Sequence, residues 1–237
     1  MNDVVALVDD PGPEHPARVV AEAGARLLAC RARSVSVHEA SSVEQVLSLA
    51  RTTLSEPGVE ALVVAGTDSA APAWRIITDA TKPVFVVPTG ARLPRGRFSR
   101  VLLPLDGGST AADAVAVLAS RMASSATLLA AHVFEPDTVP AYWDQAAHAG
   151  PSWEQEFLAR SVPEVVGLRL CHGDPATEVV AQVEACGADL LVLGWGRRLA
   201  GSRARIVRRA LAGPVPVLLI GTGYEAASAR GSRTPTR

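Results

Sequence analysis

The sequence predicts an α/β fold built from two tandem halves, each with its own parallel sheet. Three observations predict it. Short apolar segments alternate with segments of helical periodicity, the apolar segments recur in the same order in the second half, and a stretch rich in Gly, Pro and Arg separates the copies. Strands that alternate with helices are typical of parallel sheets joined by right-handed crossovers. We therefore expect two homologous domains.

The predicted strands come in matching pairs. Each is short, apolar throughout and rich in β-branched residues, which is typical of strands buried on both faces of a parallel sheet. The pairs are 4–9 with 101–106, 61–66 with 189–194, and 82–87 with 215–220. Asp9 and Asp106 are 97 positions apart, whereas Gly66 and Gly194 are 128 apart, so the second half carries about 31 extra residues, around 134–165. The first half is therefore the reduced copy.

Helical patterns lie between the strands. Ser41 and Glu44 form a capping box before the first pattern, and Asp174 followed by Pro175 is typical of an N-cap and a first helical residue before the third. Apolar residues recur at helical spacing over 43–54, 115–122 and 179–186. These patterns predict crossover helices between the strands.

The domain boundaries follow from these elements. The stretch between the halves has no apolar periodicity, and its arginines indicate either a solvated linker or a basic binding patch; we expect the linker. The polar end of the chain predicts disorder. The expected parts are a reduced domain at 1–88, a linker at 89–100, a larger domain at 101–224 and a disordered tail at 225–237.

Composition excludes several classes of protein. The chain is 48% hydrophobic and 20% charged with a formal net charge of -1, which excludes a disordered protein or a polycationic nucleic-acid binder. Without a basic leader or an apolar run of ~18 residues, we expect a cytoplasmic protein with no membrane partner. The three cysteines are widely spaced and predict buried thiols, and the five histidines lack metal-ligand spacing, so we expect no metal site.

Five segments of the second half together resemble the universal stress protein family. They are 101–107, 128–133, 173–176, 188–194 and 214–218. The resemblance covers nearly all of 100–222 and is fainter over 4–88. It implies Rossmann-like (adenine nucleotide alpha hydrolase-like) domains in a bacterial stress-response protein. It also implies that the two halves form an intramolecular pseudo-dimer, a covalent version of the family's homodimer, whose final strands meet across a pseudo-twofold axis.

The resemblance further implies an ATP site in the second half, at the carboxyl ends of the strands. An aspartate that ends the first strand and backbone groups after the second would hold the adenosine, and a glycine loop that opens the last helix would wrap the phosphates. Here the glycines are compressed: Arg197 stands where the family has its second glycine, and Val207 where it has the third. The candidate residues are Asp106, Val133, Gly194, Gly196, Arg197, Gly201, Ser202 and Arg203.

The arginines around this loop have two interpretations. They could bind a phosphate in place of the missing glycine amides. Alternatively, they could form the solvent-exposed face of a helix that buries Ile206, Val207, Ala210 and Leu211. In the first half, the loop after Gly66 has one glycine and places Asp68 where phosphate would lie, so we expect no nucleotide there. His132 lies in an apolar strand and is expected to be a satisfied core histidine.

Two functional hypotheses follow. The first is a non-catalytic module that binds ATP or a related adenine nucleotide in the second half and alters contacts with a partner or a second copy. The second is a degenerate family member that binds no nucleotide and works as a protein-interaction or dimerisation module, through the insertion at 142–153 or the tail. A nucleotide hydrolase would need a carboxylate that holds a metal ion and a second group that orients the water. Asp106 is the only good candidate for the carboxylate, so we expect no enzymatic activity.

Overall fold

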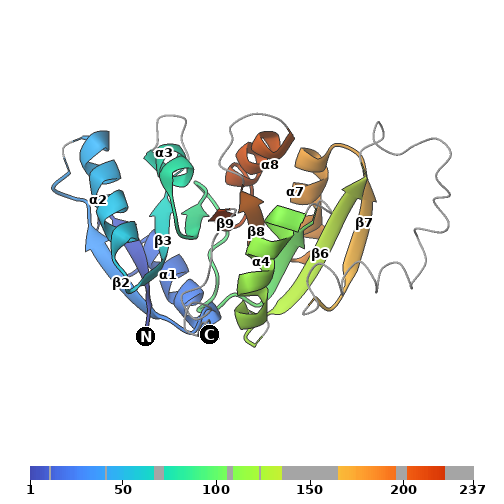
Figure 1. The fold of residues 1–237 in the computed structure, drawn as a ribbon, viewed down its shortest axis with the longest axis horizontal. Coiled ribbons are helices and arrows are strands. Elements are labelled where there is room, and N and C mark those ends of the chain that lie inside the picture. Colours follow the sequence, from blue (N-terminus) through green and yellow to red (C-terminus); the bar gives the residue numbers. More distant parts are fainter. Residues whose placement is uncertain are drawn as a thin grey trace, which may run out of the picture.

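The computed structural model describes residues 1–10, 12–40, 42–66, 72–105, 109–122, 124–134, 165–195 and 202–221. Within them, nine strands form one sheet with helices on both faces (Figure 1). The elements of the first half are β1 (Asp3–Val8), α1 (Pro16–Leu27), β2 (Arg31–Ser36), α2 (Val43–Ser55), β3 (Val59–Ala65), α3 (Pro72–Asp79) and β4 (Val84–Val87). Those of the second half are β5 (Arg100–Pro104), α4 (Ser109–Met122), β6 (Thr127–Phe134), β7 (Leu168–His172), α7 (Pro175–Cys186), β8 (Leu190–Trp195), α8 (Ser202–Leu211) and β9 (Val217–Gly221).

The two halves have the same strand order on either side of a central joint. The order is β2-β1-β3-β4 in the first half and β7-β6-β5-β8-β9 in the second, so only β7 lacks a counterpart among the described strands. All neighbours within a half are parallel, while β4 and β9 pair antiparallel. We expected each half to have its own parallel sheet. In the structure, the edge strands β4 and β9 pair and join the two half-sheets into one continuous sheet.

The pairing of β4 with β9 is itself symmetric. Phe85 lies opposite Leu218, and its neighbours Val84 and Val86 lie opposite Leu219 and Val217. Phe85 and Leu218 each stand two residues after the proline that opens the repeated segment. Equivalent residues thus face each other at the centre of the joint, which is the register that a local twofold relation requires.

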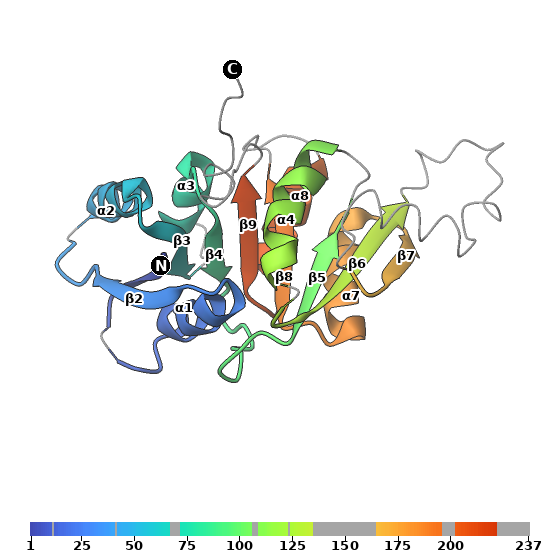
Figure 2. The ribbon, with the colours of Figure 1, turned by 60° about the horizontal axis from the view of Figure 1, so that its bottom comes forward.

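Two apolar clusters sandwich the sheet. One contains the buried faces of α1 and α4, and the other those of α2, α3, α7 and α8. Figure 2 shows α1 and α4 on the same side of the sheet. Because each cluster draws residues from both halves, the core is continuous across the joint. None of the described helices has the length and apolar character that crossing a membrane would need.

Residues 89–100, for which we expected a solvated linker, are mostly exposed but also contact both halves. Phe98 is fully buried and its ring stacks on Phe85, with ring centroids 6.2 Å apart. The Arg92 amide donates to the Pro214 carbonyl at 2.8 Å, and its guanidinium pairs with Glu184 at 3.0 Å. The segment therefore belongs to the core as well as to the surface.

The helix caps confirm one prediction and correct another. Asp174 caps α7 as predicted, accepting the Thr177 amide at 3.0 Å, with Pro175 in the first turn. The N-cap of α2 is Ser42, which accepts the Gln45 amide at 3.3 Å, so the N-cap lies one residue later than the predicted Ser41. Four elements were not predicted from the sequence: α1, β2, α3 and β7.

Candidate functional site

The candidate site lies at the carboxyl edge of the second half-sheet. Strand β5 runs between β6 and β8, pairing Val101 with Leu190 on one side and Pro104 with Ala131 on the other. The chain order of the strands reverses at β5, and in open α/β sheets such a switch point leaves a crevice beyond the carboxyl ends of the strands. The edge is therefore the place where this fold can hold a small ligand.

Two of the predicted residues are seen at this edge. Val133 is half-buried near the end of β6, and Gly194 is half-buried near the end of β8, where it pairs with Ile220. Ser202 and Arg203 form the first turn of α8, and this turn continues directly from the predicted loop. Asp106, Gly196, Arg197 and Gly201 lie outside the described residues, although Asp106 immediately follows Leu105, whose amide donates to the Ala131 carbonyl at 2.8 Å.

The arginine-rich helix α8 has a solvent-exposed face, as predicted by the interpretation in which the arginines cover the outer side of the helix. Val207, Ala210 and Leu211 are buried and Ile206 is half-buried, while Arg205, Arg208 and Arg209 are exposed. Arg205 approaches the Asp174 carboxylate at 3.8 Å. Hydrogen bonds from Thr177 lower the pKa of Asp174, which keeps the cap ionised. Whether Arg197 and Arg203 contact a phosphate stays a prediction.

A hydrogen bond from the His132 side chain links β6 to the residue that follows β5. Its Nδ1 lies 2.7 Å from the Leu105 carbonyl oxygen, so the ring is hydrogen-bonded, as expected of a satisfied histidine, although it is half-buried. The ring meets Phe134 edge to face at 4.7 Å, and Phe134 in turn stacks on His172 at 5.3 Å. Sequence reasoning missed the contact with β5, because it depends on the register between segments 27 residues apart.

The carboxyl edge of the first half is arranged differently. Asp9, which matches Asp106 in the repeat, is 79% exposed, yet its carboxylate accepts a hydrogen bond from His15 Nε2 at 2.7 Å. His15 caps α1, and its Nδ1 accepts a hydrogen bond from the Ala17 amide at 3.2 Å. Nε2 therefore carries the ring proton and donates the hydrogen bond to Asp9. This bond lowers the pKa of Asp9. The carboxylate is thus already bound by a neighbour in its own half.

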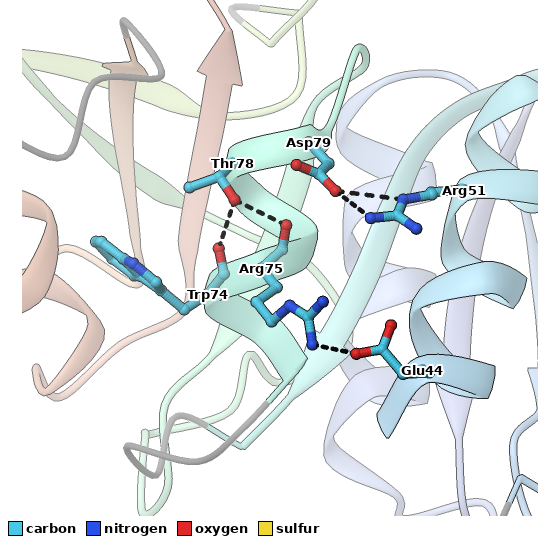
Figure 3. A network of polar contacts seen from close by, with 6 residues as sticks. All are labelled: Glu44, Arg51, Trp74, Arg75, Thr78 and Asp79. Atoms are coloured by element: carbon cyan, nitrogen blue, oxygen red, sulfur yellow. Dashed lines mark hydrogen bonds and ion pairs between the residues drawn. The ribbon is translucent and has the colours of Figure 1, made fainter. Parts of the chain in front are cut away.

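A separate pocket of about 260 Å³ lies between α2 and α3. Its floor is apolar, and Arg51 and Asp79 form an ion pair at its rim with a closest distance of 2.5 Å. Figure 3 shows this pair beside the Arg75 to Glu44 contact. Ser55 and Thr81 line it too, and they lie where α2 and α3 lead back to the amino ends of β3 and β4. The pocket is therefore far from the carboxyl edge and includes none of the predicted site residues.

The cysteines are buried thiols, as predicted. Cys30, Cys171 and Cys186 are free and buried, and burial raises the pKa of the Cys30 and Cys171 thiols. A raised pKa disfavours the nucleophilic thiolate. The described residues contain no group of three or more His, Cys, Asp or Glu side chains able to hold a metal ion.

Comparisons with known proteins identify similar chains. A model of the universal stress protein family matches residues 97–220, which is just over half of the chain. No curated protein matches it significantly. A functionally unknown protein from Pseudomonas aeruginosa is 13% identical over 94% of this chain and 93% of its own, with a TM-score of 0.58. A universal stress protein from Archaeoglobus fulgidus is 15% identical over 81% of this chain and 70% of its own, with a TM-score of 0.52.

A further structure is that of a universal stress protein in complex with cAMP. It is 25% identical to this chain and covers 53% of it and 98% of its own length, with a TM-score of 0.39. The two matches with higher TM-scores show that a similar fold, extending over 81% and 94% of this chain, occurs in other chains.

Proposed function

The chain belongs to the universal stress protein family, and we propose that it is a non-catalytic, cytoplasmic stress-response module that binds an adenine nucleotide, ATP in the first place, in its second half only. The observation that carries the proposal is the meeting of four structural features at one edge. The carboxyl ends of β5, β6 and β8 and the first turn of α8 lie around the switch point of the second half-sheet.

The chemistry of this edge suits an adenine nucleotide. The first amides of α8 have no partner within the helix, and the helix dipole favours a negative charge there, so a phosphate can bind at this end. Asp106, one residue beyond β5, would accept a hydrogen bond from the ribose or the base. The backbone near Val133 would contact the adenosine, and Arg197 and Arg203 would face the phosphates in place of missing glycine amides.

Asymmetry between the halves supports binding in the second half only. Asp9 already accepts a hydrogen bond from His15 at 2.7 Å, so a ligand hydroxyl would have to compete with it. The loop after Gly66 offers a single glycine and the like-charged Asp68. We propose the same division for the domains, 1–88 and 101–224, with β4 and β9 joining the halves as an intramolecular pseudo-dimer.

The test combines extraction with calorimetry. The purified protein is denatured, its supernatant is analysed by ion exchange for nucleotide, and the nucleotide-free protein is titrated with ATP and cAMP. We expect Asp106→Ala to weaken ATP binding about tenfold to a hundredfold, because a hydrogen bond to a charged group contributes about 1.5–3 kcal/mol. Asp9→Ala, the matched change in the other half, should leave the affinity unchanged.

Two results would contradict the proposal. Absence of nucleotide in the extract together with absence of heat at millimolar ATP excludes binding. Equal losses from Asp106→Ala and Asp9→Ala would show that the halves are not divided as proposed.

A second candidate function is favoured by the compressed glycine loop. Arg197 stands at the family's second glycine position, and its side chain could prevent close approach of a phosphate. In that case the protein would act as an interaction or dimerisation module. A chain that gives no heat with ATP, but whose oligomeric state in sedimentation depends on residues 142–153 or on the tail, would support this candidate instead.

A further inference from the structure

The pocket between α2 and α3 has an apolar floor built from both helices. Leu47, Ala50 and Leu54 lie at helical spacing on α2, and Ile76 lines the pocket from α3. None of these four side chains is more than 5% exposed. Pockets for drug-sized ligands usually enclose about 300–1,000 Å³. The space of about 260 Å³ over this floor therefore suits a smaller apolar group.

The ion pair at the rim leaves polar groups of both signs available. Arg51 approaches Asp79 with Nε at 3.2 Å and Nη2 at 2.5 Å, and both nitrogens reach the same oxygen, Oδ2. Among the described residues, Oδ1 of Asp79 and Nη1 of Arg51 have no hydrogen-bond partner of their own. A guanidinium has five N–H donors, and a carboxylate accepts several hydrogen bonds. The intact pair can therefore bind one further anion and one further cation.

The charges lie at the mouth of the pocket and the apolar groups at its bottom. The Arg51 and Asp79 side chains are 56% and 45% exposed, and Figure 3 shows them reaching toward each other from α2 and α3. A ligand with a single charge would lie close to a like charge here, because the two groups are in contact. A ligand with both charges meets a complementary partner for each. The rim thus favours a zwitterion whose apolar part points inward.

From this arrangement we propose that the pocket between α2 and α3 binds a free α-amino acid with an aliphatic side chain. The carboxylate contacts Arg51, the ammonium group contacts Asp79, and the side chain fills the space over Leu47, Leu54 and Ile76. Both charged groups of an α-amino acid are attached to one carbon, which matches two rim groups that touch each other. The site lies in the first half and does not depend on nucleotide binding in the second.

Four probes separate the parts of such a ligand. L-Leucine carries all three groups, isocaproate lacks the ammonium group, isoamylamine lacks the carboxylate, and glycine lacks the side chain. Each is titrated into the full chain while the amide signals of Ala50 and Ile76 are followed by NMR. We expect leucine to bind in the millimolar range and each other probe at least about threefold more weakly, because an exposed charge pair contributes up to about 1 kcal/mol.

Two results of these titrations would overturn the proposal. Unchanged Ala50 and Ile76 signals with leucine in the tens of millimolar would show that the pocket takes no amino acid. Isocaproate, isoamylamine or glycine binding as tightly as leucine would show that the corresponding group is not recognised.

Variants of the two ion pairs between α2 and α3 provide a matched control. Arg51→Gln and Asp79→Asn should each weaken leucine binding about threefold, and the advantage of leucine over isocaproate should disappear in Asp79→Asn. Arg75→Gln breaks the neighbouring pair with Glu44, which has the same closest distance of 2.5 Å but does not line the pocket, so it should leave the leucine affinity unchanged. Equal losses in Arg51→Gln and Arg75→Gln would mean that the packing of the helices, rather than the rim charges, determines binding, and the zwitterion proposal would fail.

Discussion

Asp9 and Asp106 occupy the same place in the repeat, but the two strand ends before them contact different histidines: His15 contacts Asp9 itself, and His132 contacts Leu105. Sequence analysis predicted their places beyond the first strand of each half from the repeat alone. It could not predict that His15 donates to Asp9 or that His132 holds the residue before Asp106. Both contacts depend on how a loop or a neighbouring strand is placed in space. The repeat therefore predicts where a site lies, while its chemistry depends on contacts between segments.

The pairing of Asp9 with His15 predicts a stability effect that depends on pH. The bond favours the carboxylate and lowers the pKa of Asp9 below its ordinary value of 3.8. Asp9 therefore adds stability above about pH 3.8, and this contribution disappears as the pH falls through the lower pKa of the folded state. Because the carboxylate is mostly exposed, the contribution should be below about 1 kcal/mol.

Urea unfolding between pH 5 and pH 2 tests this expectation. Asp9→Asn should destabilise the protein at pH 5, and its difference from wild type should shrink towards zero as the pH falls. The control is the same substitution in a His15→Gln background, where the difference should be small at every pH. A difference between wild type and Asp9→Asn that stays constant down to pH 2 would be inconsistent with this assignment.

At the scale of elements, the sequence predicts the central strands better than the strands at the edges of the sheet. The strands buried on both faces have continuous apolar sequences, so 4–9, 61–66, 101–106 and 189–194 were predicted to within two residues. The edge strands β2 and β7 are mostly exposed or half-buried, and their mixed sequences give no such signal. Helix α1 does carry a helical stripe, and its Pro16 start was a usable signal that the sequence analysis did not use.

Residues 89–100 show what composition does not reveal about the packing of a segment. Their arginines and glycines predicted a solvated linker, but one aromatic residue decides how the segment packs. Phe98 lies under the joint of the two halves and stacks on Phe85, whose ring also lies 3.0 Å from the position that a Cβ on Gly24 would occupy. Residues from α1, β4 and the segment thus meet at one point of the core.

This packing predicts an unequal pair of substitutions. Phe98→Ala should lower the free energy of unfolding by about 3 kcal/mol, because it removes a fully buried aromatic side chain and leaves a cavity. Arg97→Ala, at the exposed neighbouring position, should change it by less than about 0.5 kcal/mol. Chemical denaturation of both variants measures the difference. Similar small effects would show that residues 89–100 are a linker after all.

At the scale of the whole molecule, the halves are joined by more than the strands β4 and β9. On the α1 and α4 side, Glu60 of β3 has a side chain only 2% exposed, and it pairs with Arg121 of α4 at 2.6 Å. Asn2 donates to the other carboxylate oxygen of Glu60 at 2.6 Å, and Arg121 also donates to the Leu28 carbonyl at the end of α1. An ion pair between a buried carboxylate and a half-buried guanidinium, with these additional hydrogen bonds, connects the first half to the second.

The joint predicts that the halves unfold together. Glu60→Gln should lower the free energy of unfolding by about 2–3 kcal/mol, because it replaces the charge-assisted hydrogen bond between the buried Glu60 carboxylate and the half-buried Arg121 guanidinium by a neutral contact. Glu184→Gln breaks the exposed pair with Arg92 and should cost less than about 1 kcal/mol. The sheet and both apolar clusters run through the joint, so amide exchange in β1 and in β8 should respond equally to Glu60→Gln. Faster exchange in β1 alone would mean that the first half opens independently, and the pseudo-dimer would then be two separately stable domains.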